Sequence, residues 1–126
     1  LLARIEAKER YGYDIDLGAV RAAKFLYGKH VSFFHGDSKF INQEKIDVLI
    51  LVNWIHNLSP KELEDILIPM THKVTYFLLD AIHLDGPEIY RYKHDFKFLY
   101  RVAELLSVTP APNEPRSFHL FKVVIK

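Results

Sequence analysis

The sequence contains no cysteine. Disulfide bonds, zinc sites built on thiolates and cysteine nucleophiles are therefore excluded. A chain without cysteine is compatible with a reducing compartment, and we expect a cytoplasmic protein.

An excess of charge of one sign is also lacking. The 17 Lys and Arg residues and 16 Asp and Glu residues leave a formal net charge of +1. Binding to a nucleic-acid backbone requires a clustered basic surface, so we expect no nucleic-acid partner. The apolar runs are far shorter than the roughly 20 residues that span a bilayer, and we expect no membrane partner.

The composition is otherwise that of a globular protein. The chain has 126 residues, of which 49% are hydrophobic and 26% charged. This length suits one domain that buries roughly two thirds of the surface of its unfolded chain without a stabilising metal or disulfide. We predict a single domain over residues 1–126.

The stretch Ile46–Ser59 predicts a central strand followed by a helix. Its apolar run continues through residues 48–52 without a polar break, which is typical of a parallel strand buried on both faces. Asn53 ends the run. Ser59, Pro60 and Glu62 then form a capping box with proline at the first helical position.

The first third of the chain predicts a helix, a short strand, a second helix and a second strand. We place them at Leu1–Arg10, Tyr13–Asp16, Leu17–Tyr27 and Val31–His35. Asp16 is in position to cap the second helix, and Gly28 is in position to end it.

The last part predicts a further buried strand, a long loop, a helix and a hairpin. The strand is Val74–Leu79, the loop runs over residues 81–94, and apolar spacing predicts a helix over Phe96–Leu106. Two strands, 107–112 and 117–125, are separated by a short turn and must pair antiparallel.

The alternation of strands and helices predicts an α/β fold. We expect a Rossmann-like, mainly parallel sheet with helices on both faces and a C-terminal antiparallel hairpin at one edge. In such sheets, ligands bind beyond the carboxyl ends of the strands. The strands that we predict end in Asp14, Asp37, Asn53 and Asp80. Each could be a cap or turn residue by itself, but four polar side chains at one edge favour a binding site.

This order of motifs resembles the class I S-adenosylmethionine-dependent methyltransferases, of the type that acts on small molecules. The run from Gly12 to Asp16, then Gly36-Asp37, then Asp47–Val52 followed by Asn53-Trp54-Ile55-His56 carries the likeness, and it extends over essentially the whole chain. The closing antiparallel strand is similar to that family's last strand. The resemblance implies methyl transfer from S-adenosylmethionine to a small-molecule substrate.

The resemblance also implies which residues would bind the cofactor. Asp14 would bind the ribose hydroxyls, a role that acids after such a strand commonly have. Ile15 would pack on the adenine, and Asp37, with Ser38 beside it, would receive the adenine amino group. Asn53 and Trp54 would lie near the methionine part. The alternative for Trp54, the only tryptophan, is an ordinary core aromatic.

His56 is the candidate general base near the methyl acceptor; the alternative is a loop histidine bonded to the backbone. The 81–94 loop is rich in aromatic and histidine side chains, and we expect a substrate lid there, although a solvated loop would also fit. The lid residues are His83, Tyr90, Tyr92 and His94. The seven histidines are scattered without the spacing of a helical metal site, so we expect no metal.

The family's first strand and glycine-rich loop have no counterpart in this sequence. The uncapped start at Leu1 predicts that the natural protein continues upstream and that these residues alone bind cofactor weakly or not at all. We expect the missing strand between the strand ending at Asp14 and strand 47–52, which would then lie about 9.5 Å apart. Upstream residues, or self-association with another copy, would fill the gap.

Two other functions stay open. One is a nicotinamide dinucleotide-dependent dehydrogenase domain, in which Asp14 would bind the adenosine ribose; the final antiparallel hairpin and the Asn53–His56 loop argue against it. The other is a non-catalytic α/β interaction module.

Overall fold

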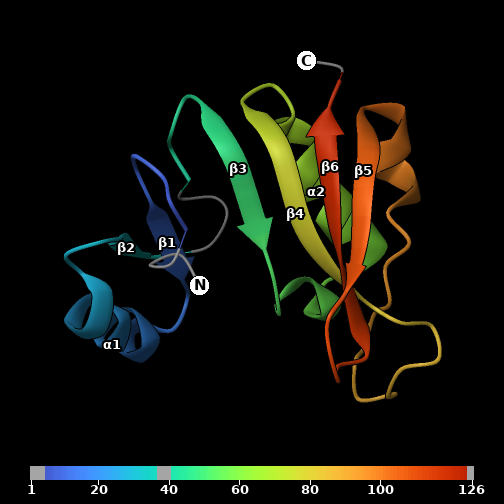
Figure 1. Ribbon diagram of the computed structural model, residues 1–126, viewed down its shortest axis with the longest axis horizontal. Coiled ribbons are helices and arrows are strands. Elements are labelled where there is room, and N and C mark those ends of the chain that lie inside the picture. Colours follow the sequence, from blue (N-terminus) through green and yellow to red (C-terminus); the bar gives the residue numbers. More distant parts are fainter. Residues whose placement is uncertain (1–4, 37–40, 125–126) are drawn as a thin grey trace. The chain divides into compact units, whose positions relative to one another are not determined.

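The computed structural model describes residues 5–36 and 41–124. The chain forms two compact units, residues 1–43 and 44–126, which we call unit 1 and unit 2 (Figure 1). The single domain expected over the whole chain stays a prediction. None of the helices in the described ranges is long and apolar enough to cross a membrane.

Unit 1 is a strand–helix–strand arrangement. Strands β1 (Tyr11–Asp14) and β2 (Ser32–His35) pair in parallel, and helix α1 (Leu17–Tyr27) connects them. The side chain of Asp16 accepts hydrogen bonds from two backbone N–H groups of the first turn of α1, and the N–H of Gly28 closes the last turn. The predicted helix and both of its end signals are confirmed. Both are local interactions, which explains why the sequence was sufficient to place them.

The predicted helix at Leu1–Arg10 is wrong over its described part. Residues 5–10 are not helical, and Leu1 and Leu2 lie outside the described residues. The few apolar positions in this stretch gave a weak helical period. A short helix without a cap needs tertiary packing to form, and residues 6–9 are exposed.

Unit 2 contains a four-stranded sheet in the order β3-β4-β6-β5. β3 (Ile46–Leu51) pairs in parallel with β4 (Val74–Ile82), whereas β6 (Arg116–Val123) is antiparallel to both β4 and β5 (Ala103–Pro110). The C-terminal antiparallel hairpin is confirmed. The sheet is nevertheless mixed rather than mainly parallel, because one strand of the hairpin inserts between β4 and β5.

Helix α2 (Pro60–Met70) covers one face of this sheet (Figure 1). Ser59 and Glu62 form the predicted capping box, with Pro60 in the first turn. The sequence predicted helices on both faces of the sheet. Within either unit, the described residues do not show this arrangement. The helix and the sheet share a core whose largest fully buried side chains include Leu63, Leu67, Phe77, Leu79, Leu99 and Phe121.

β3 is less buried than its sequence predicts. It is an edge strand of the unit 2 sheet, and the side chain of Val48 is 47% exposed, whereas Leu49 is buried. The expectation of burial on both faces is wrong for Val48. A continuous apolar run indicates a strand, but it does not show which elements cover each face of that strand. β1 and β3 belong to different units and to different sheets. Their separation, and the strand expected between them, stay predictions.

The predicted helix Phe96–Leu106 is wrong. A short 3-10 helix, η4 (Lys97–Arg101), is followed directly by β5, which starts at Ala103 instead of the predicted residue 107. Phe96 has left-handed backbone dihedrals (φ 57°) and is 1% exposed, so the chain turns sharply before η4. Pairing with β6 outweighs the local helical spacing, as tertiary context often does.

Candidate functional site

The loop that follows β3 is fixed in an unusual conformation. Asn53 has a φ of 61°, in the left-handed region that few non-glycine residues other than Asn and Asp adopt. After Trp54 the chain enters a single 3-10 turn, η3 (Ile55–Asn57). The side chain of Ile55 is fully buried and anchors this turn, while Asn53 stays exposed and Trp54 and His56 are half-buried. The candidate residues are thus presented at the carboxyl end of β3.

A buried carboxylate holds this loop. Oδ2 of Asp80 accepts the backbone N–H of Asn53 at 3.0 Å and Nη1 of Arg116 at 2.7 Å. The same Nη1 donates to Oδ1 of Asn53 at 3.1 Å. One carboxylate oxygen and one guanidinium nitrogen thereby fix both the main chain and the side chain of Asn53.

Asp80 and Arg116 are both withdrawn from solvent. Asp80 is 2% and Arg116 is 8% exposed. Burial lowers the pKa of Arg116, but the charge of Asp80 and the hydrogen bond to it outweigh this effect and raise the pKa above its ordinary value. Arg116 is therefore a permanent cation in this site. Asp80 was expected to end a strand at the edge of the sheet; instead it lies inside β4, which continues to Ile82.

The segment predicted as a lid lies against η3. Its first two residues, 81 and 82, belong to β4, which corrects the predicted boundary. The N–H of Tyr92 donates to the carbonyl of His56 at 3.1 Å. Nε2 of His94 donates to the carbonyl of Ile55 at 2.8 Å, which fixes the proton on that nitrogen. Tyr90 meets the ring of His56 edge-on, with 5.1 Å between centroids.

Of the predicted substrate residues, Tyr90, Tyr92 and His94 thus lie against η3, with Tyr90 and Tyr92 in contact with His56. His83 instead lies beside β6, where its Nε2 is 2.8 Å from Oγ of Ser117. Nδ1 of His56 is buried and has no hydrogen-bond partner among the described residues. No group of three or more His, Asp or Glu side chains that could hold a metal occurs in the described ranges.

The remaining predicted cofactor residues belong to unit 1. Asp14 ends β1 and is exposed, and its Oδ1 accepts the N–H of Asp16 at 2.8 Å. Ile15 follows with 67% of its side chain exposed. Asp37 and Ser38 lie outside the described residues. The roles predicted for all these residues stay predictions.

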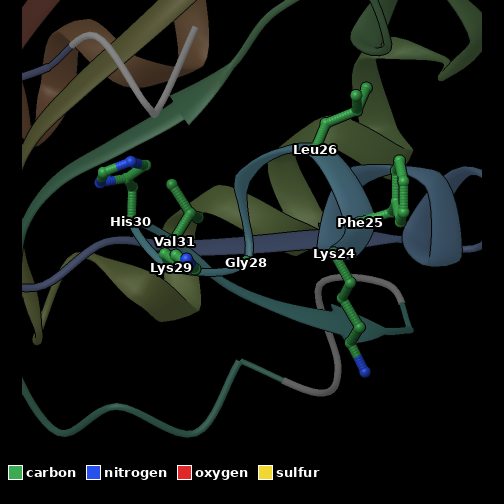
Figure 2. Close-up of a pocket in the computed structure, with 7 residues that line it drawn as sticks. All are labelled: Lys24, Phe25, Leu26, Gly28, Lys29, His30 and Val31. Atoms are coloured by element: carbon green, nitrogen blue, oxygen red, sulfur yellow. The ribbon is translucent and has the colours of Figure 1, made fainter.

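Unit 1 also has an open surface pocket beside the C-terminal end of α1. Figure 2 shows that Lys24 and Leu26 point in different directions from the helix. None of the catalytic, cofactor-binding or substrate residues predicted from the sequence lines this pocket. The lining residues are Lys24, Phe25, Leu26, Gly28, Lys29, His30 and Val31.

Sequence reasoning missed Arg116, and it placed Asp80 at the binding edge of the sheet without giving it a role. Asp80 follows the apolar run of β4, and Arg116 precedes the apolar run of β6. A charged residue beside a strongly apolar strand is a weak signal of a buried ion pair. Their separation by 36 positions in the sequence conceals that these two charges are partners.

Solved structures with the same fold are methyltransferases and related biosynthetic proteins. The N,N-8-amino-8-demethyl-D-riboflavin dimethyltransferase RosA from Streptomyces davawensis has a TM-score of 0.74 at 12% identity, over 98% of this chain and 44% of that one. Magnesium protoporphyrin IX methyltransferase (ChlM) from Synechocystis PCC 6803, solved with bound S-adenosylmethionine, has a TM-score of 0.68 at 16% identity, over 90% and 59%. The pyocyanin biosynthetic protein PhzM has a TM-score of 0.67 at 13% identity, over 92% and 43%.

No protein-family profile and no curated protein sequence matches this chain. The chain spans about half the length of the three structures described above. At these identities the likeness establishes the fold. The predicted resemblance to small-molecule S-adenosylmethionine-dependent methyltransferases is therefore confirmed as a structural resemblance.

Proposed function

We propose that this chain forms part of an enzyme that transfers a methyl group from S-adenosylmethionine to a small-molecule acceptor. The observation that carries the proposal is the fold shared with S-adenosylmethionine-dependent methyltransferases over most of the chain. A second support is the polar loop at the carboxyl end of β3, which is where ligands of open α/β sheets bind.

The described residues fit the cofactor chemically. Asp14 offers an exposed carboxylate that can accept hydrogen bonds from two ribose hydroxyls, and the exposed side chain of Ile15 offers an apolar surface for adenine. Asn53 presents an amide for the methionine part, with its conformation fixed by Asp80 and Arg116. When bound, the sulfonium of S-adenosylmethionine supplies the electrophilic methyl group.

The protein's part in such a reaction is to align the acceptor with the methyl group and to exclude water. His56 is the residue that we propose as general base for acceptors that lose a proton. Its Nδ1 has no partner among the described residues, and the ring is held edge-on by Tyr90. A neutral histidine nitrogen without a partner is the kind of group that acts as a general base.

Calorimetric titration of the natural polypeptide that carries these residues would test the proposal. We expect S-adenosylhomocysteine to bind and the dinucleotide NAD not to bind. Asp14→Ala should weaken binding by about 1.5–3 kcal/mol, because charge-assisted hydrogen bonds to the ribose are lost. Asp65→Ala is the matched control, since Asp65 is an exposed acid on α2 that pairs with Lys61.

Each outcome separates the candidate functions. Binding of NAD instead of S-adenosylhomocysteine would indicate a dehydrogenase domain, and binding of neither would favour the non-catalytic interaction module. Unchanged affinity in a folded Asp14→Ala variant would remove Asp14 from the site while leaving the methyltransferase proposal intact.

A further inference from the structure

We propose that Arg116 is a positioning residue: through Asp80 it sets the conformation of the Asn53 loop, and through Tyr90 it ties residues 83–94 of the predicted lid to that loop. The inference rests on the proposed function, because it assigns to Asn53 a place in the cofactor site. Arg116 itself was not expected from the sequence. All the residues concerned belong to unit 2.

The first step is the conformation of Asn53. A left-handed asparagine is tolerated but is not the preferred state, so a free loop would sample other conformations. Here the N–H of Asn53 is held by Asp80 and its side-chain oxygen by Arg116. With that oxygen engaged, the amide NH₂ of Asn53 is oriented as a hydrogen-bond donor.

The second step is the geometry of the ion pair. Arginine–carboxylate pairs are frequently bidentate, with two parallel hydrogen bonds. Here both donors converge on Oδ2 of Asp80, while its Oδ1 is buried without a hydrogen-bond partner among the described residues, as is Nε of Arg116. The pair therefore forms one hydrogen bond rather than two, and the same two atoms, Oδ2 of Asp80 and Nη1 of Arg116, also bind Asn53.

The third step is the reach of Arg116. Its guanidinium carbon lies 5.9 Å from the centroid of the Tyr90 ring, within the range of a cation–π contact. Its Nε is 3.6 Å from the carboxylate of Glu114 in the β5–β6 turn. Tyr90 in turn contacts His56. Arg116 therefore joins the two segments that carry Asn53 and the predicted lid residues.

The test uses Trp54, the only tryptophan and the immediate neighbour of Asn53, as a reporter of loop conformation. The main variant is Asp80→Asn combined with Arg116→Gln, which leaves no unpaired buried charge. We expect it to fold, to bind S-adenosylhomocysteine about tenfold more weakly, and to show greater quenching of Trp54 by iodide. The conservative Arg116→Lys variant keeps the charge and should recover most of the affinity.

Two further variants complete the design. Asn53→Ala alters an exposed residue and should reproduce the weaker binding and the greater quenching. When Asn53→Ala is combined with the double variant, its effect should be smaller than in the parent protein, because the three residues act as one unit. Arg101→Gln is the matched control: Arg101 is an exposed arginine that pairs with Glu64, outside this network.

The outcomes are distinguishable. If the parent protein binds no S-adenosylhomocysteine, the proposed function fails, and the Trp54 measurements still test the positioning role. If the parent binds and the double variant matches it in both affinity and quenching, the inference is overturned. Should the double variant fail to fold, unchanged affinity and quenching in Asn53→Ala would overturn it equally.

Discussion

His119 shows how one side chain can make the stability of this protein depend on pH. It lies on β6, with its ring stacked near Phe121 and edge-on to Phe96, and its Nδ1 is buried without a hydrogen-bond partner among the described residues. Burial lowers the pKa of His119 below its ordinary value of 6.5, and the neighbouring charge of His83 contributes in the same direction. The folded state therefore favours the neutral ring.

This depressed pKa predicts a loss of stability in acid. Below pH 6.5 the unfolded state binds a proton at this position that the folded state resists, so the free energy of unfolding falls as the pH is lowered from 7.5 to 5.5. Replacing His119 by Phe keeps the aromatic contacts and should flatten the curve. Urea denaturation at several pH values measures this. Replacing the exposed His30 by Gln is the control; an equally steep pH dependence in His119→Phe would contradict the assignment.

At the scale of the element, α2 is the clearest case of local sequence controlling local structure. The side chain of Ser59 accepts the N–H of Glu62 at 3.2 Å, and the carboxylate of Glu62 accepts the N–H of Ser59 at 3.1 Å. The backbone hydrogen bond to Ser59 lowers the pKa of Glu62. These two bonds satisfy N–H groups that would otherwise have no partner at the helix start.

Ser59→Ala removes the first of these bonds and should lower the free energy of unfolding by about 1 kcal/mol. Lys61→Ala is the matched control on the same turn, because an exposed i,i+4 pair such as Lys61–Asp65 contributes little to stability. Urea denaturation with tryptophan fluorescence would measure both. Equal losses in the two variants would show that the cap contributes no more than a surface charge pair.

At the scale of the whole molecule, the buried apolar side chains are unevenly divided between the two units. Of the described residues, Val20 and Val31 are the buried hydrophobic ones of unit 1, whereas the others, among them Phe77 and Phe121, belong to unit 2. β4 and β6 each have a hydrogen-bonded neighbour on both sides, but β1 and β2 pair only with each other among the described strands. Stability should differ between the units accordingly.

Hydrogen exchange followed by mass spectrometry or NMR would detect this difference in the 126-residue chain. We expect the amides of β4 and β6 to exchange slowest and those of β1 and β2 to exchange much faster, since a two-stranded pair with little buried surface opens readily. The amides at the exposed strand ends of unit 2 serve as the internal reference for fast exchange. Protection of β1 equal to that of β4 would show instead that the two units open together.

The sequence by itself determined the features that rest on neighbouring residues. Both ends of α1 and the start of α2 follow from Asp16, Gly28 and the Ser59 capping box, which act within a few residues of the chain. The strand at Ile46–Leu51, the polar loop after it and the closing antiparallel hairpin were likewise predicted correctly. Together these elements were sufficient for the resemblance to methyltransferases that the fold then confirmed.

Only the tertiary structure decided what depends on partners far apart in the chain. Residues 103–105 belong to a stretch with helical spacing, yet they pair with β6 as a strand, because hydrogen bonds and burial across the sheet outweigh a weak local preference. Arg116 meets Asp80 and Asn53 across 36 and 63 residues, and no local pattern encodes such a pair. The side chains were visible in the sequence, but their convergence on one carboxylate oxygen is a product of the β4–β6 pairing.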